Sequence, residues 1–239
     1  MEDYLLTRQK RIEDARNLAI QFFKERSAEQ IMLETGTAIG GVIGASGKAV
    51  ILGADSQMTA GHRKIMGFEK IFEIDKYTAV GITGAVAFLQ DIVKIFEVEI
   101  CFRQMLKSDG TVLSPGGKAN ILAGLVKQVI SLPLVYGIGM GFLLAVYDPK
   151  DDEARLFTIG SLGSVYEDKK KFSADGCGGI WVYSIFRSNY DEFGGVNMNK
   201  KNLVKLTRKA IQHAIDNDSY CGGKKLIYLV DEKGARRMK

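Results

Sequence analysis

The residues best suited to metal chemistry do not fall at the spacings that metal sites need. The three cysteines, Cys101, Cys177 and Cys221, lack the short intervals typical of zinc ligands. The two histidines, His62 and His213, cannot form a multi-histidine centre on their own. We therefore expect no metal site. A cysteine count that is both odd and small also excludes a secreted fold held together by disulfides.

Two glycine-bearing segments could be mistaken for nucleotide-binding loops. The sequence Gly-Ile-Gly-Met-Gly at 137–141 lacks the strand–turn–helix context and the following acidic residue of a dinucleotide site, so we predict a loop. Gly47 and Lys48 are followed by Ala49, where a phosphate loop has Ser or Thr, and a strand pattern comes next. The sequence therefore predicts no nucleotide cofactor.

The composition is that of a globular protein, and 239 residues correspond to one large domain or two small ones. Apolar residues make up 46% and charged residues 26%, which excludes disordered and collagen-like chains. A net charge of +5, from 33 basic and 28 acidic residues, is too diffuse to indicate nucleic-acid binding. The chain has neither an apolar run of about 18 residues nor a secretory signal, so we expect a cytoplasmic protein with reduced thiols and no membrane contact.

The hydrophobic pattern changes after residue 36. Residues 3–27 have apolar side chains at helical spacing and predict one amphipathic helix. The rest of the chain predicts strands and helices in alternating groups. The expected strands cover 37–44, 48–54, 71–74, 77–82, 142–147, 155–159, 164–167 and 225–230, the last of which closes the chain. The expected helices cover 85–106, 118–132, 180–190 and 200–217.

This order of elements predicts an α+β fold. Short turns join most consecutive strands, so their pairing should be mostly antiparallel. The strands are long and apolar enough to be covered on both faces. A four-layer αββα sandwich, with two mostly antiparallel sheets between layers of helices, satisfies both conditions.

Seven segments, taken in order along the chain, resemble one protein family. They are Thr-Ala-Ile-Gly-Gly at 37–41, Gly-Ala-Asp-Ser-Gln-Met-Thr-Ala-Gly at 53–61, Glu-Lys-Ile-Phe-Glu-Ile-Asp at 69–75, Gly-Ile-Thr-Gly-Ala-Val-Ala at 81–87, Ser-Pro-Gly-Gly-Lys-Ala-Asn at 114–120, Asp-Gly-Cys-Gly-Gly at 175–179 and Asp-Asn-Asp-Ser-Tyr-Cys-Gly-Gly at 216–223. The family is that of 20S proteasome β subunits of the bacterial, actinobacterial-like type, which are N-terminal nucleophile hydrolases. Its fold is the αββα sandwich that the pattern predicts.

The resemblance implies that the chain is made as a precursor. Residues 1–36 would be a propeptide removed by autocatalytic cleavage between Gly36 and Thr37, and residues 37–239 would be the hydrolase domain. Thr37 then becomes the N-terminal nucleophile; Thr35, which follows Glu34, is the rival position. A threonine hydroxyl needs a base beside it, and its own α-amine, with an unperturbed pKa of about 8, can serve.

The resemblance also assigns roles around Thr37. Lys70 matches the buried lysine whose charge would lower the pKa of the terminal amine, and Asp55 matches its carboxylate partner. The backbone N–H of Gly84 matches the oxyanion donor. Asp218 matches the aspartate that orients the groups around the amine. By the same resemblance, the pocket for the residue before the cut is lined by Met58, Thr59, Phe68, Ile82 and Val86.

Two cysteines depart from the family pattern. Cys177 and Cys221 stand where serines usually lie close to the nucleophile. A thiol is a weaker hydrogen-bonding group than a hydroxyl, and a neutral hydrogen bond contributes about 0.5–1.5 kcal/mol. Each replacement should therefore cost up to about tenfold in rate and leave the activity in place.

The spacing departs as well. The interval from Thr37 to Asp55 is two residues longer than usual, and we place the extra residues in the turn at 45–47. The interval from Asp55 to Lys70 is one residue shorter. A displaced Lys70 would harm catalysis more than either cysteine.

The favoured hypothesis is a threonine-type endopeptidase. It would join other β subunits in a heptameric ring capped by proteasome α subunits, with a regulatory ATPase ring acting through the α ring, and degrade unfolded polypeptide without metal or cofactor. One alternative is a structural β-ring subunit made inactive by the cysteine and spacing changes. A second is the related ATP-dependent peptidase of simpler bacterial rings, whose subunits carry almost no propeptide.

Overall fold

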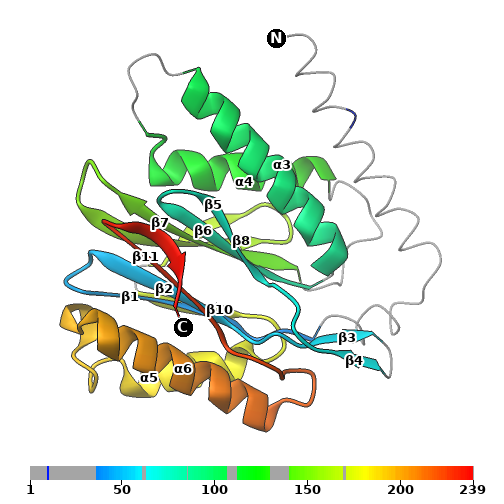
Figure 1. The fold of residues 1–239 in the computed structure, drawn as a ribbon, viewed down its shortest axis with the longest axis vertical. Helices are drawn as coiled ribbons and strands as arrows, with labels where there is room; N and C mark the ends of the chain where they lie inside the picture. Colours follow the sequence, from blue (N-terminus) through cyan, green and yellow to red (C-terminus); the bar gives the residue numbers. More distant parts are fainter. Residues whose placement is uncertain are drawn as a thin grey trace.

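The computed structural model describes residues 10, 36–60, 63–84, 86–106, 112–129, 140–168 and 171–238. Apart from Lys10 and Gly36, the predicted propeptide and its amphipathic helix lie outside the described residues. The described elements stack in four layers, with helices above and below two sheets (Figure 1). The α+β sandwich predicted from the sequence is confirmed.

The first sheet has five strands, all antiparallel to their neighbours, in the order β10-β1-β2-β11-β12. Its central pair forms because the two apolar runs flank a short turn, and both strands are buried along their whole length. The strands are β1 (Ile39–Gly44), β2 (Ala49–Ala54), β10 (Phe172–Asp175), β11 (Leu226–Asp231) and β12 (Gly234–Arg237).

The second sheet also has five antiparallel strands, in the order β5-β6-β7-β8-β9. The strands are β5 (Ile71–Asp75), β6 (Thr78–Thr83), β7 (Gly141–Asp148), β8 (Glu153–Gly160) and β9 (Val165–Glu167). A small separate hairpin is formed by β3 (Met58–Ala60) and β4 (Arg63–Ile65). It projects beside the sheets in Figure 1.

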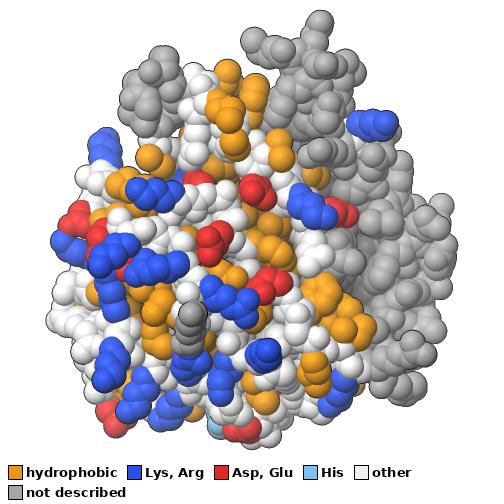
Figure 2. All heavy atoms as spheres, viewed as in Figure 1, with side chains coloured by type: hydrophobic (Ala, Val, Ile, Leu, Met, Phe, Trp, Pro, Cys, Tyr) orange, Lys and Arg blue, Asp and Glu red, His pale blue; other side chains and the backbone are white. Residues whose placement is uncertain are grey.

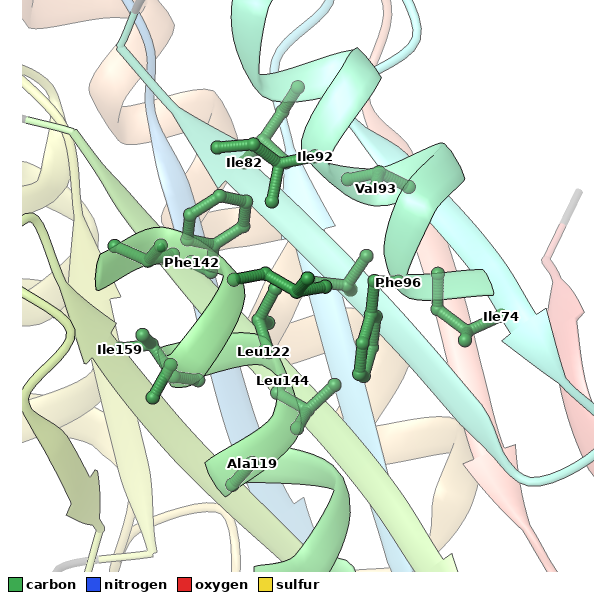
Figure 3. Packing of buried hydrophobic residues seen from close by; sticks show 14 of the residues in the cluster. Ile74, Ile82, Ile92, Val93, Phe96, Ala119, Leu122, Phe142, Leu144 and Ile159 are labelled. Atoms are coloured by element: carbon green, nitrogen blue, oxygen red, sulfur yellow. The ribbon is translucent and has the colours of Figure 1, made fainter. Parts of the chain in front are cut away.

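Helices cover the outer face of each sheet, and apolar clusters fill the three interfaces. α3 (Val86–Met105) and α4 (Pro115–Val129) pack on the second sheet, where Figure 3 shows the side chains of both helices meeting those of β6, β7 and β8. α5 (Gly179–Asn189) and α6 (Lys200–Asn217) pack on the first sheet. The third cluster lies between the two sheets. This packing accounts for the apolar character of strands that are covered on both faces.

The sequence prediction missed the short or polar strands. The strand over 225–230 was expected to close the chain, and this is wrong because β12 follows it. β12 reads Gly-Ala-Arg-Arg and pairs with β11 at the edge of the sheet, where one face is solvated and the apolar pattern is weak. β10, β3 and β4 have only four, three and three residues, so they show little hydrophobic period, although the equally short β9 was predicted.

The turn at 45–47, where we place the extra residues before Asp55, links β1 to β2. Ala45, Ser46 and Gly47 have φ angles of 53°, 58° and 83°, in the left-handed region. The amide N–H groups of Ala45 and Ser46 donate to the carbonyls of Met198 and Val196 at 2.8 and 2.7 Å. The turn is therefore anchored, and the register between β1 and β2 continues unbroken to the opposite end of the strands.

On the face seen in Figure 2, basic side chains are interspersed with acidic and apolar ones. Within the described ranges, no helix has the length and apolar character needed to cross a membrane.

Candidate active site

Thr37 lies just before β1, inside the molecule, with an exposed fraction of 0%. Its carbonyl accepts hydrogen bonds from the Gly178 N–H at 3.1 Å and from the Cys177 thiol at 3.4 Å. Its own N–H donates to the Cys177 sulfur at 3.2 Å. Gly176 has a φ of 87°, and a Cβ there would lie 2.3 Å from the Thr37 carbonyl oxygen. The glycines let the segment after β10 close directly onto Thr37.

Asp55 is positioned by the β1–β2 pair. Ile39 lies opposite Ala54, so the residue after β2 reaches the residue before β1. The Asp55 N–H donates to the Ala38 carbonyl at 3.1 Å, and the Ala38 N–H donates to Asp55 Oδ1 at 2.9 Å. The N–H groups of Gln57 and Gly222 donate to Oδ2 at 3.1 and 3.0 Å. The buried carboxylate thus accepts three backbone hydrogen bonds.

Lys70 precedes β5 and is also fully buried. Its ammonium Nζ lies 2.7 Å from Asp55 Oδ1, which makes an ion pair with both side chains at 0% exposure. Nζ also donates to the Gly36 carbonyl at 3.2 Å. The Thr37 hydroxyl donates to that same carbonyl at 2.8 Å. The carbonyl of the peptide bond between Gly36 and Thr37 is therefore bonded to both a cation and a hydroxyl.

Asp218, Cys221 and Cys177 form a second group beside Thr37. Asp218 caps the C-terminal end of α6, and its Oδ1 accepts from the Tyr220 N–H at 2.9 Å. The Cys221 thiol lies 3.5 Å from Asp218 Oδ2 and 4.0 Å from the Cys177 sulfur. Among the described residues, no hydrogen bond joins Asp218 directly to Thr37, so its contact with the nucleophile runs through the two sulfurs.

The two thiols have opposite electrostatic environments. The hydrogen bond from Cys221 lowers the pKa of the Cys177 thiol below its usual value, against the opposing effect of burial. The same hydrogen bond, together with burial, raises the pKa of Cys221. Cys177 is exposed and Cys221 is buried, so the thiol with the lowered pKa is the accessible one.

Gly84 lies at the same end of the sandwich as Thr37. It follows β6 with a φ of 108°, a conformation that favours glycine. The neighbouring Thr83 hydroxyl donates to Asp175 Oδ2 at 3.3 Å, and Asp175 lies opposite Ile39 in the β10–β1 pair. The sequence analysis did not single out Asp175, although it begins the quoted segment at 175–179.

The predicted pocket residues fall into different environments. Met58 and Phe68 are half-buried and pack against the cluster beneath α3, to which Ile82 belongs. Ile82 is fully buried beside Ile92 (Figure 3). Thr59 is buried, and its hydroxyl accepts from Gln57 Nε2 at 3.2 Å. Val86 begins α3, but its side chain lies outside the described residues. Among these residues, Met58 and Phe68 are therefore more accessible to solvent than Ile82.

An αββα sandwich with a buried threonine, lysine and aspartate at one end is consistent with the N-terminal nucleophile hydrolase fold. Comparison with known proteins shows which family of this fold the chain belongs to. The sequence matches the family "Proteasome subunit" over residues 33–230. It is 30% identical over 205 residues to "Proteasome subunit beta" of Acidothermus cellulolyticus, covering 79% of this chain and 67% of that protein. It is 27% identical over 197 residues to "Proteasome subunit beta" of Streptomyces griseus, covering 79% and 67%.

A third relative, "Proteasome subunit beta" of Stackebrandtia nassauensis, is 25% identical over 203 residues. The chain belongs to the proteasome subunit family, among β subunits of the bacterial type. Membership of this family implies a protease that works in an assembly with other subunits.

Proposed function

We propose that this chain is the proteolytic β subunit of a 20S core particle, a threonine endopeptidase that first removes its own residues 1–36. The observation that carries the proposal is the buried ammonium of Lys70, bonded to Asp55 at 2.7 Å and to the Gly36 carbonyl at 3.2 Å. The Thr37 hydroxyl lies 2.8 Å from the oxygen of that carbonyl. A nucleophile, a cation and the bond to be cut therefore share one buried site.

The contacts at Gly36 support self-cleavage. Lys70 withdraws electron density from the carbonyl, which makes its carbon more open to attack. The Thr37 oxygen adds to that carbon, the bond from the carbonyl carbon to the Thr37 nitrogen breaks, and the proton of the hydroxyl passes to the departing nitrogen. Water then hydrolyses the resulting ester, leaving a carboxylate on Gly36 and a free hydroxyl on Thr37.

The same groups support hydrolysis of other chains once the terminal amine is free. The amine is the base that takes the proton of the Thr37 hydroxyl as it attacks a substrate carbonyl. The nearby Lys70 charge lowers the pKa of that amine and favours its neutral form. The Gly84 N–H donates to the oxyanion, and Asp218 with the two thiols orients the amine. Water releases the acyl group and restores the enzyme.

The geometry favours this function over an inactive ring subunit. The spacing changes on both sides of Asp55 leave the Lys70–Asp55 pair intact, with four hydrogen bonds to the carboxylate. The Cys177 sulfur still accepts from the nitrogen of Thr37, as a hydroxyl would. Substitution of a thiol for a hydroxyl costs up to about tenfold in rate, which lowers an activity without abolishing it.

The proposed setting is a heptameric β ring capped by α subunits in the cytoplasm, with a regulatory ATPase acting through the α ring. Exposed apolar side chains support docking on other subunits, since large apolar groups on a surface commonly mark interfaces. They include Leu162, Tyr166, Ile180 and Trp181. The substrates are unfolded polypeptides that can enter the ring.

The test is the mass and N-terminal residue of the chain purified in an assembled particle with its α subunits. We expect the wild-type chain to begin at Thr37 and the Thr37→Ala chain to keep all 239 residues. An assembled wild-type particle that retains Met1 would support the inactive subunit. A Thr37→Ala chain that still begins at residue 37 would refute self-cleavage by this hydroxyl.

A further inference from the structure

Beside Thr37, the side chains of Cys177, Asp218 and Cys221 form a cluster that the proposed peptidase chemistry does not require in this form. Their ligand atoms all lie within 4.8 Å of one another. We propose that this thiol cluster is a binding site for a thiophilic divalent cation of the Zn²⁺ class, and that the bound ion blocks the terminal amine of the mature chain. The binding part stands by itself, whereas the blocking part rests on the proposed peptidase function.

The distances within the thiol cluster suit tetrahedral coordination. With metal–sulfur bonds of about 2.3 Å, two sulfurs on a tetrahedral ion lie about 3.8 Å apart. The Cys177 and Cys221 sulfurs are 4.0 Å apart. A sulfur and a carboxylate oxygen on the same ion lie about 3.6 Å apart. The Cys221 sulfur and Asp218 Oδ2 are 3.5 Å apart. The third pair, the Cys177 sulfur and the Asp218 carboxylate, lies within 4.8 Å, so binding requires side-chain rotations that bring these two groups onto one ion.

The fold holds these ligands in place although they come from distant parts of the sequence. Cys177 follows β10, which pairs with β1, and Cys221 follows α6. The Cys221 N–H donates to the Asp218 carbonyl at 3.0 Å, so these two ligands belong to one turn. A Cβ on Gly178 would lie 2.6 Å from the Cys221 sulfur. The glycine at this position leaves the sulfur the room that it occupies between the two segments.

The ligand types select the ion. Thiolates favour zinc and other soft cations, whereas magnesium and calcium prefer oxygen ligands. Both thiols lose their protons when they bind a metal, so binding releases protons. The Cys177 residue is exposed, which gives an ion a route to the cluster.

Processing would complete the site. The Thr37 nitrogen lies 3.2 Å from the Cys177 sulfur. In the precursor this nitrogen is an amide and has no lone pair to offer, so the protein supplies three ligands and water supplies the fourth. After cleavage the same nitrogen is an amine, which can take the fourth position. Its lone pair is then bound to the metal and cannot accept the proton of the Thr37 hydroxyl, so hydrolysis stops.

Binding is tested first, on assembled particles that carry the unprocessed Thr37→Ala chain. Zn²⁺ is titrated in competition with a chromophoric chelator, and Co²⁺ is used as a spectroscopic probe of thiolate ligation. We expect one ion per chain and a sulfur-to-cobalt absorption band. Cys177→Ser and Cys221→Ser should each weaken binding by roughly a hundredfold or more and remove the band, a larger loss than changes beyond the ligands produce. Cys101→Ser, on the exposed face of α3, is the matched control and should bind like its parent.

The second arm measures peptide hydrolysis by mature particles. Equimolar Zn²⁺ should lower the rate by about 10² or more, because the base is removed, and a chelator should restore it. The double variant Cys177→Ser with Cys221→Ser should hydrolyse peptides at the same rate with and without Zn²⁺, whatever its basal rate. Inhibition that resists a chelator but yields to a thiol reductant would indicate a disulfide and contradict the metal site.

The outcomes separate the two proposals. Absence of binding, or equal binding by the serine variants, overturns the metal site and leaves the cysteines as small packing residues. Binding with an unchanged rate overturns the blocking role alone. A particle with no peptidase activity in any form contradicts the proposed function, while the titration on the unprocessed chain still decides the metal site.

Discussion

Replacement of Lys70 by methionine tests how much the buried ion pair between Lys70 and Asp55 contributes to the stability of the chain. At 2.7 Å and an effective dielectric constant of about 20, the attraction between Lys70 and Asp55 is about 6 kcal/mol, most of which offsets the cost of burying both charges. Removal of one partner from a buried pair typically costs about 3–5 kcal/mol. The loss of unfolding free energy in Lys70→Met should lie at the low end of this range, about 3 kcal/mol, because the Asp55 carboxylate keeps its three backbone hydrogen bonds.

The opposite change should cost more. Asp55→Leu leaves the Lys70 ammonium with its hydrogen bond to the Gly36 carbonyl but without the carboxylate, and it deprives three buried N–H groups of their acceptor. Each buried donor without a partner costs about 1–3 kcal/mol. The loss should therefore exceed about 5 kcal/mol, and the Asp55→Leu chain should accumulate poorly or unfold at low denaturant. Asp55→Leu should therefore lose more unfolding free energy than Lys70→Met.

The assay is urea unfolding followed by the fluorescence of Trp181, the single tryptophan. Trp181 lies on α5, and its ring is edge-on to the ring of His213 on α6, with 5.6 Å between the ring centroids. Its fluorescence should therefore change when these two helices separate. All variants are made in the Thr37→Ala chain, so every protein compared has the same 239 residues. Lys94→Met, which removes an exposed ion pair, is the control and should cost well under about 1 kcal/mol. The reasoning fails if Lys70→Met unfolds within about 1 kcal/mol of its parent, or if it costs more than Asp55→Leu.

Three further predictions concern processing, acid stability and specificity. Gly36→Ala should slow self-cleavage by roughly tenfold to a hundredfold, because the new Cβ would lie 2.5 Å from both Cβ and O of Tyr220 and must displace the Gly36 carbonyl. Chain masses measured at intervals after synthesis give the cleavage rate, and an unchanged rate would contradict this prediction. Burial raises the pKa of Asp231, but hydrogen bonds from Arg236 and Lys200 outweigh this effect and leave that pKa well below its usual value. Its contribution to stability is therefore present above about pH 4 and lost as the pH falls further, so Asp231→Asn should flatten the dependence of unfolding free energy on pH in this range, and an equally steep profile would argue against it. Fluorogenic peptides with Leu, Phe or Tyr before the cut should be cleaved fastest, since Met58 and Phe68 are apolar and an unpaired charge beside them would be penalised; faster cleavage after Arg or Glu would overturn the pocket assignment.

The layers of the fold could be predicted from the sequence because each main element carries its own period. β1 and β2 are apolar runs around a turn, and α6 has buried residues at helical spacing, from Leu203 to Ala214. The edge strand β12 could not be predicted, because its pairing with β11 uses backbone groups and its residues hardly alternate. β12 forms because the chain turns back after β11 and lies along its free edge.

The candidate site was predictable in its residue types and less so in its contacts. The quoted segments contain Thr37, Asp55 and Lys70, and the structure brings these three together. The backbone donors from Gly178 and Gly222 carry no side-chain signal, so only the fold reveals them. The thiol cluster could not be predicted from the sequence either, because Cys177 and Cys221 lack the spacing of metal ligands. The two sulfurs meet because β10 pairs with β1 while α6 packs across the same sheet.

The position of Lys70 implies that processing and peptide hydrolysis can be separated by mutation at Gly36 but not at Lys70. The ammonium contacts the Gly36 carbonyl and the Asp55 carboxylate. The proposed cleavage would remove the first of these acceptors with residues 1–36 and leave the second in place. A change of Lys70 therefore affects both reactions. A change of Gly36 should affect only the first, because the proposed cleavage removes residue 36 from the mature chain. Gly36→Ala particles that have been cut should hydrolyse peptides at the wild-type rate for each chain that begins at Thr37. A lower rate per processed chain would mean that the strain at Tyr220 outlasts the cleavage.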